Sequence, residues 1–196
     1  MRIKIMIAAA SLLLLAPVLP FTGKTEANAE LARDKSEQFS ALAQLPTGGP
    51  TMNVRIYING YSNPDECQNL HALLLEGGPS ALLKALQKMK PIGRIAREGT
   101  VGMYDFKFIV SKQTADGRVI YAVADRPIGF LEAYYDTRSR DYPFGILQLN
   151  LKNSDKHEKG EGTLIYAAHI KVIDGDKVET ENLSFAPIKL LGVRQL

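Results

Sequence analysis

Tryptophan is absent from this chain, cysteine occurs once and histidine three times. A single cysteine excludes an intramolecular disulfide, so the chain is not a small domain held together by disulfide bonds. One cysteine and three histidines also leave few strong ligands for a metal centre, which requires several side chains converging on one point. We therefore expect a fold that depends on its hydrophobic core, with no bound metal and no cofactor.

A strong excess of charge of one sign is also missing. The chain has 24 Lys+Arg against 21 Asp+Glu, a formal net charge of +3 over 196 residues. Its basic residues form no stripe with interleaved aromatic side chains, so the sequence does not favour a nucleic-acid-binding protein. Hydrophobic residues make up 45% and charged residues 23%, which is typical of a globular protein and excludes a disordered chain.

The N-terminal residues carry the pattern of a secretory signal peptide. Arg2 and Lys4 precede an uncharged run over 5–20, and the small residues Ala27 and Ala29 follow it. The run is shorter than the ~20 residues that a membrane-spanning helix needs, and two prolines interrupt it. We expect residues 1–29 to be a signal peptide, cleaved after Ala29. The mature chain would then be exported to the periplasm or the medium and would have no stable membrane span.

Residues 30–52 are predicted to be an N-terminal tether or linker. An incomplete apolar stripe over 30–45, which includes Phe39, indicates a short helix. The stretch 46–50 contains two prolines and two glycines, which break any helix. The remaining residues, 53–196, have the size of a single domain.

A pair of helices is expected after the first strand of this domain. Asn63 is a typical N-cap residue, and the proline and two acidic residues after it suit the first turn of a helix over 64–76. Gly77–Gly78 would end that helix. Pro79 would begin a second helix, which Pro91 prevents from continuing.

Most of the remaining domain is predicted as strands, because apolar residues alternate with polar ones. Asp116–Gly117 and Asp174–Gly175 are typical of tight hairpin turns. The predicted strands cover 54–59, 104–111, 119–123, 130–135, 147–152, 164–172, 178–185 and 188–193. The fold class is therefore α+β, an antiparallel β-meander of about seven strands with the helical pair inserted after the first strand. A sheet that partly closes into a barrel is the alternative.

The single cysteine lies on the predicted apolar stripe of the first helix. Cys67, Leu70 and Leu74 are spaced to share one helix face, which favours a thiol packed against the core. His71 is four residues after Cys67 and could form a metal-ligand pair with it. No second pair of such residues exists in the sequence, so the packing interpretation is favoured.

The densest polar cluster lies between Glu132 and Tyr142. Arginine side chains bind carboxylates and sulfates in a forked geometry, and tyrosine rings provide flat amphipathic surface. The candidate binding residues are therefore Tyr134, Tyr135, Arg138, Arg140, Asp141 and Tyr142. In the alternative interpretation, the neighbouring arginines and aspartates pair with each other and hold a turn between two strands.

No standard catalytic motif is present in the sequence. A Gly-x-Ser-x-Gly nucleophile turn and a phosphate-binding glycine loop are both missing. The sequence therefore favours a non-catalytic binding or accessory module, whose partner is an unknown protein or small molecule.

Two other classes of function remain open at this stage. The first is a small carrier whose sheet encloses an apolar ligand against aromatic side chains, namely Tyr104, Phe106, Phe108, Tyr121 and Tyr166. The second is a hydrolase that uses the acidic residues Asp125, Glu132 and Asp136.

Overall fold

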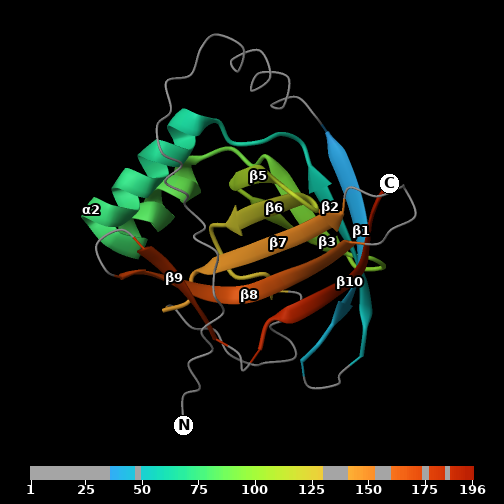
Figure 1. Cartoon of the computed structure of the whole chain (residues 1–196). Helices are drawn as coiled ribbons and strands as arrows, with labels where there is room; N and C mark the ends of the chain where they lie inside the picture. The colour runs from blue at the N-terminus through green and yellow to red at the C-terminus, as the bar shows by residue number, and fades with distance from the viewer. Residues whose placement is uncertain (1–35, 47–49, 130–140, 153–159, 174–176, 184–185) are drawn as a thin grey trace.

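The computed structural model describes residues 36–46, 50–129, 141–152, 160–173, 177–183 and 186–196. In this part of the chain, ten strands form one sheet and one helix packs against it (Figure 1). The elements in chain order are β1 (Glu37–Gln44), β2 (Met52–Ile58), α2 (Pro64–Lys88), β3 (Gly93–Arg97), β4 (Met103–Phe106), β5 (Phe108–Thr114), β6 (Gly117–Ala124), β7 (Phe144–Lys152), β8 (Gly160–Ile173), β9 (Lys177–Asn182) and β10 (Ile188–Gln195).

The sheet is antiparallel and nearly closes into a barrel. Its strand order is β4-β3-β2-β1-β10-β8-β7-β6-β5, and β9 pairs with β8 beside this path. The first and last strands of that order, β4 and β5, are consecutive in the chain and are separated only by Lys107. The backbone N–H of Lys107 donates to the carbonyl oxygen of Val123 in β6 (2.9 Å). One run of chain thus joins the two ends of the sheet.

The antiparallel α+β class and the partly closed barrel are confirmed, but the strand count is higher than expected. One extra strand is β1, which lies in the segment predicted as a helical tether. Phe39, Ala41 and Ala43 are buried and alternate with more exposed residues, so the apolar period is two rather than 3.6. β1 pairs with β2 on one side and with β10 on the other. The short helix expected over 30–45 is therefore wrong for these residues.

The expected helical pair is one helix with a kink. Asn63 caps it, and its side chain accepts from the N–H of Glu66 while the Glu66 carboxylate accepts from the N–H of Asn63. Only Gly78 leaves the helical region, with φ 67° and ψ −170°, and Gly77 does not. Pro79 directly follows the kink, where its missing N–H costs little, so the helix resumes at once.

Both hairpins predicted from Asp-Gly pairs are confirmed. In the first, Thr114 of β5 pairs with Gly117 of β6. Gly117 has φ +156°, and a Cβ built there would lie 1.9 Å from the carbonyl oxygen of Leu151, so the position requires glycine. In the second, β8 and β9 pair up to Ile173 and Lys177, and the turn itself lies outside the described residues.

The two longest alternating runs each divide between two cores. In β8, Leu164 and Tyr166 belong to the barrel interior, whereas Ile170 packs beneath α2. A register shift between β7 and β8 falls between these positions and moves the later side chains to the other face. Phe106 and Phe108 are divided in the same way by the break at Lys107. The sequence predicted a single face for each run, which is wrong.

Candidate functional site

The predicted binding segment is only partly described by the structure. Asp141 and Tyr142 are described, and they precede β7. The other candidate binding residues remain predictions because they lie outside the described residues, namely Tyr134, Tyr135, Arg138 and Arg140. The strand expected over 130–135 lies outside them as well.

Asp141 and Tyr142 lie against one face of the β8–β9 hairpin. The Tyr142 ring meets the His169 ring edge to face, with centroids 5.9 Å apart and planes at 64°. His169 Nδ1 is 2.5 Å from the backbone oxygen of Asp141. His169 pairs directly with Glu181 of β9. We call this surface, formed by Tyr142, His169, Lys171 and Glu181, the arm face.

The charges of the arm face are paired with each other. Lys171 Nζ donates to Glu181 Oε2 at 2.5 Å, and the two side chains are 48% and 37% exposed. The hydrogen bond from Lys171 is the main cause that lowers the pKa of Glu181, and the same bond raises the pKa of Lys171. This exposed ion pair adds little to stability, but it fixes the direction of two charged groups beside an aromatic pair.

A second polar cluster, which the sequence did not predict, is buried at one end of the barrel. The Glu37 side chain is fully buried, and its two carboxylate oxygens accept from Arg118 Nη1 at 3.0 Å and Nη2 at 3.1 Å. The Tyr61 hydroxyl also donates to Glu37, and Gln195 Nε2 lies 3.4 Å from its Oε1. Burial first, and then the bond to Glu37, raise the pKa of Tyr61. We call these four residues the barrel-end cluster.

The barrel-end cluster is best explained as a structural plug. Four donors converge on the Glu37 carboxylate. A carboxylate has about four acceptor sites, so these donors occupy all of them. No acceptor site of Glu37 is then left for a ligand. Its residues are far apart in sequence, since Glu37 and Arg118 are separated by 81 positions. The alternation of side chains along a strand could have indicated this cluster. Glu37 is two residues from the buried Phe39, and Arg118 is two residues from the buried Ile120, so both side chains face the barrel interior.

The five aromatic residues expected to line a carrier cavity do not share one space. Phe106 and Tyr166 are buried in the barrel interior, and Tyr104 packs at the edge of the same cluster. Phe108 lies on the opposite face, beneath α2. Tyr121 lies between two residues that face the interior, so its ring points outward, where partial burial raises its pKa.

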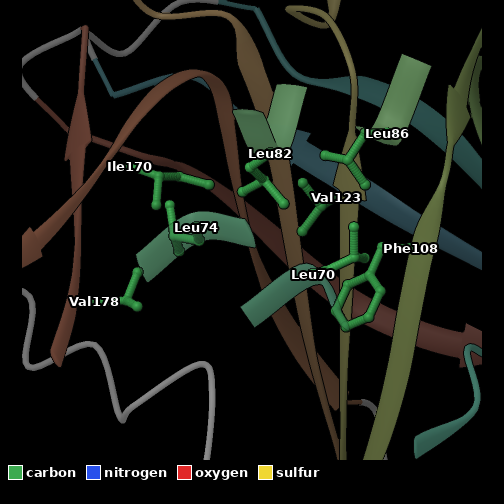
Figure 2. A pocket seen from close by; sticks show the side chains of 8 residues that line it. All are labelled: Leu70, Leu74, Leu82, Leu86, Phe108, Val123, Ile170 and Val178. Carbon is green, nitrogen blue, oxygen red and sulfur yellow. The ribbon is translucent and has the colours of Figure 1, made fainter. Parts of the chain in front are cut away.

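A small apolar cavity lies between α2 and the outer face of the sheet (Figure 2). Its volume is about 30 Å³, and its lining comes from both halves of the helix and from four strands. The lining residues are Leu70, Leu74, Leu82, Leu86, Phe108, Val123, Ile170 and Val178. The cavity is therefore a packing defect at the kinked helix, with no polar side chain among its walls.

Cys67 packs against this apolar layer, as the spacing predicted. Its thiol is free and half-buried. Burial, with a smaller contribution from Glu66, raises its pKa to about 11, so the neutral thiol dominates near pH 7. His71 Nε2 is buried and has no hydrogen-bond partner. Among the described residues, no group of three His, Cys, Asp or Glu side chains is placed to hold a metal ion.

Asp125 is the one member of the proposed hydrolase set that the structure describes. Its Oδ2 lies 4.0 Å from Nζ of the buried Lys107, which also donates to the backbone oxygen of Met89 at 3.1 Å. Lys107 therefore ties the C-terminal end of α2 to the point where the barrel closes. Glu132 and Asp136 lie outside the described residues, so the expected acidic set stays a prediction.

Comparisons of this chain with protein-family models, with curated proteins and with solved structures gave no match. In the part of the chain that the structure describes, no helix has both the length and the apolar character needed to cross a membrane.

Proposed function

We propose that this protein is an exported, non-catalytic binding or accessory module that recognises its partner through the arm face. The observation that carries the proposal is the contact of Tyr142 with His169 beside the Lys171–Glu181 ion pair. The four side chains combine an aromatic surface with charges of both signs. A surface of this composition suits a protein or a small polar molecule as the partner.

The arm face is also held rigidly. On the other face of the same hairpin, Ile170 and Val178 pack beneath α2 in a buried apolar layer. The backbone oxygen of Asp141 further fixes the His169 ring. A surface whose side chains are already oriented loses less conformational entropy when a partner binds, which supports recognition by this face.

Export is the second part of the proposal. β1 begins at Glu37, so cleavage after Ala29 would leave the whole barrel intact. N-terminal sequencing of the protein recovered from the periplasm or the medium should start at Glu30. A chain that keeps residues 1–29 and stays in the cytoplasm would contradict this part of the proposal.

The arm face can be tested by crosslinking the full chain to exported components of its own cell. The test variant combines Tyr142→Ala with His169→Gln, and the matched control is Tyr57→Ala, a half-buried tyrosine in β2. We expect the control and the wild type to give the same crosslinked species, and the double variant to lose at least nine-tenths of it. Equal crosslinking by all three proteins would overturn the assignment of this face.

Native mass spectrometry separates the binding module from the carrier. The barrel interior is filled by side chains such as Phe39, Phe106 and Tyr166, and the cavity beneath α2 has a volume of about 30 Å³. Ligand pockets usually measure about 300–1,000 Å³, which supports the binding module. The protein purified from its compartment should have the mass of the bare polypeptide. A constant added mass of a few hundred daltons would instead favour the carrier.

A further inference from the structure

β1, β2 and β10 lie on the side of the barrel away from α2 (Figure 1). An open groove lies on the outer face of these strands. It runs over β10, β1 and β2 and has a volume of about 500 Å³. This volume falls in the range of about 300–1,000 Å³ that is typical of sites for small molecules. The side chains that matter for its chemistry are Ser40, Leu42, Asn53, Arg55, Leu191 and Arg194, with Glu98 beside Arg55.

A bulge in β10 shapes this groove. Ser40 pairs with Arg194 and Leu42 pairs with Leu191, so β10 has one more residue than β1 over this interval. Gly192 lies in the extra length and has φ 61°, a conformation that glycine adopts without strain. A bulge bends its strand and increases the local twist, which makes the sheet surface uneven at this point.

Two arginines flank a small residue at one end of the groove. Arg194 and Arg55 pair with Ser40 from opposite sides, so the three residues form one row across three strands. Their Cα atoms span about 10 Å, a distance over which two arginine side chains can bind the same group. Serine between them leaves room for that group and offers a hydroxyl as a further donor.

The two arginines are not neutralised equally. Arg55 Nε donates to Glu98 Oε1 at 2.6 Å, which fixes this guanidinium and uses one of its five donors. Arg194 is exposed and, among the described residues, makes no ion pair or side-chain hydrogen bond. A positive charge is therefore available at this end.

The other end of the groove carries a pair of leucines beside one polar residue. Leu42 and Leu191 are direct cross-strand partners and are partly exposed on the outer face. Asn53 pairs with Leu42 on its other side, so the apolar surface is two side chains wide. An inorganic anion would gain nothing from these leucines, and a neutral apolar ligand would gain nothing from the arginines.

We infer that this groove binds a free amphipathic anion, with a carboxylate or phosphate head between Arg194 and Arg55 and a short alkyl chain over Leu42 and Leu191. The charge left unpaired at one end and the leucine pair at the other each fit one part of that ligand. Glu98, which is acidic and lies beside Arg55, directs the head toward Ser40 and Arg194. The site is separate from the arm face, so the inference does not depend on the proposed function.

Calorimetry on the full chain can test each half of the ligand. The probes are octyl phosphate and octanoate below their critical micelle concentrations, with inorganic phosphate and octanol as the isolated head and tail. We expect the amphipathic probes to bind at least tenfold more tightly than either isolated part. Arg194→Gln should weaken them at least tenfold, and Leu191→Gln should weaken octyl phosphate but leave inorganic phosphate unchanged. Lys189→Gln, an exposed charge in the same strand that does not line the groove, is the matched control.

Three results would overturn the inference. The first is equal affinity for octanol and octyl phosphate, which would remove the role of the arginines. The second is an unchanged affinity in Arg194→Gln when circular dichroism shows that the variant is folded. The third is binding to anionic lipid vesicles without binding to monomeric probes, which would make the groove a membrane contact instead.

Discussion

The barrel interior and the layer beneath α2 are two cores built on opposite faces of the same strands. The interior is filled by large side chains such as Phe39, Phe106 and Tyr166, and the barrel-end cluster closes it with a buried ion pair. The layer beneath α2 has fewer buried residues, and a cavity lies between its four helix leucines and the strands. The difference indicates that the barrel carries most of the stability and that α2 is the element held less tightly.

The weakness of the helix layer follows from one position. Leu70, Leu74, Leu82 and Leu86 line the cavity at intervals that follow a spacing of four residues. Gly78 lies at the kink between the two leucine pairs and has non-helical backbone angles, φ 67° and ψ −170°. The two pairs therefore come from helix halves that differ in direction, and the space they line lies between those halves and the sheet.

Breaking the barrel-end cluster should have the largest effect on stability. Glu37→Gln leaves Arg118 mostly buried beside a neutral partner, and removing one member of a buried pair costs about 3–5 kcal/mol. Urea denaturation measures this loss.

Glu98→Gln, in the exposed pair with Arg55, is the control, and its urea midpoint should be close to that of the wild type. The double variant Glu37→Leu with Arg118→Met should recover much of the loss, because no buried charge is left unpaired. A Glu37→Gln variant as stable as the control would contradict the role of the plug.

A matched pair of leucines compares the two cores directly. Leu149 in the interior and Leu74 beneath α2 are 0% and 1% exposed. Leu→Ala changes cost about 2–5 kcal/mol, and the cost is lower where the surroundings can relax into the space. We expect Leu149→Ala near the upper end of that range and Leu74→Ala near the lower end, by urea denaturation. The reverse order would show that the helix layer, and not the barrel, is the stiffer core.

Alkylation of Cys67 should report local loosening of α2. At pH 8 a thiol with a pKa of about 11 has about 100-fold less thiolate than an ordinary cysteine, so iodoacetamide should react slowly. The rate should rise with pH up to about 11. Because folding raises this pKa, the stabilisation from the neutral thiol is complete below the unfolded pKa and is lost as the pH rises through the folded one.

The same rate distinguishes the two cores. Leu74→Ala should speed alkylation of Cys67 in the folded protein, because it loosens the layer against which the thiol packs. Leu149→Ala should increase the alkylation rate far less when the two variants are compared at the same free energy of unfolding. Equal rates in the two variants would mean that Cys67 becomes accessible only when the whole protein unfolds.

The smallest effect is expected at the arm face. Glu181→Gln removes an exposed ion pair and should hardly change the denaturation midpoint at neutral pH. Folding lowers the pKa of Glu181, so its small contribution is present above the unfolded carboxyl pKa and is lost as the pH falls. Titration of the Glu181 carboxyl by NMR should therefore give a pKa below its ordinary value in the wild type. Lys171→Gln should move that pKa back up.

Local chemistry in the sequence was sufficient for the helix start and for the hairpins. Asn63 caps α2 as predicted, and Thr114 and Gly117 flank the first hairpin turn. These features depend on residues a few positions apart, whose backbone preferences can be read directly from the residue types. The apolar position of Cys67 was predictable for the same reason.

Features that depend on distant residues could not be predicted in this way. Alternation gives the period of a strand but not the point where a bulge moves its side chains to the other face, as happens within β8. The ion pair of Glu37 with Arg118 required knowing that β1 and β6 face one interior. The candidate binding segment is a mixed case, since Asp141 and Tyr142 do meet a polar face whose partners in β8 and β9 no local pattern revealed.

The pairing of β1 with β10 has a consequence for how the chain matures. These are the first and last strands of the described chain, and they lie side by side in the sheet. The barrel cannot close before β10 is synthesised, because β10 lies between β1 and β8 in the sheet. A nascent chain of this design therefore stays open until β10 has been synthesised, and closure of the barrel depends on a pairing between strands that are far apart in the sequence.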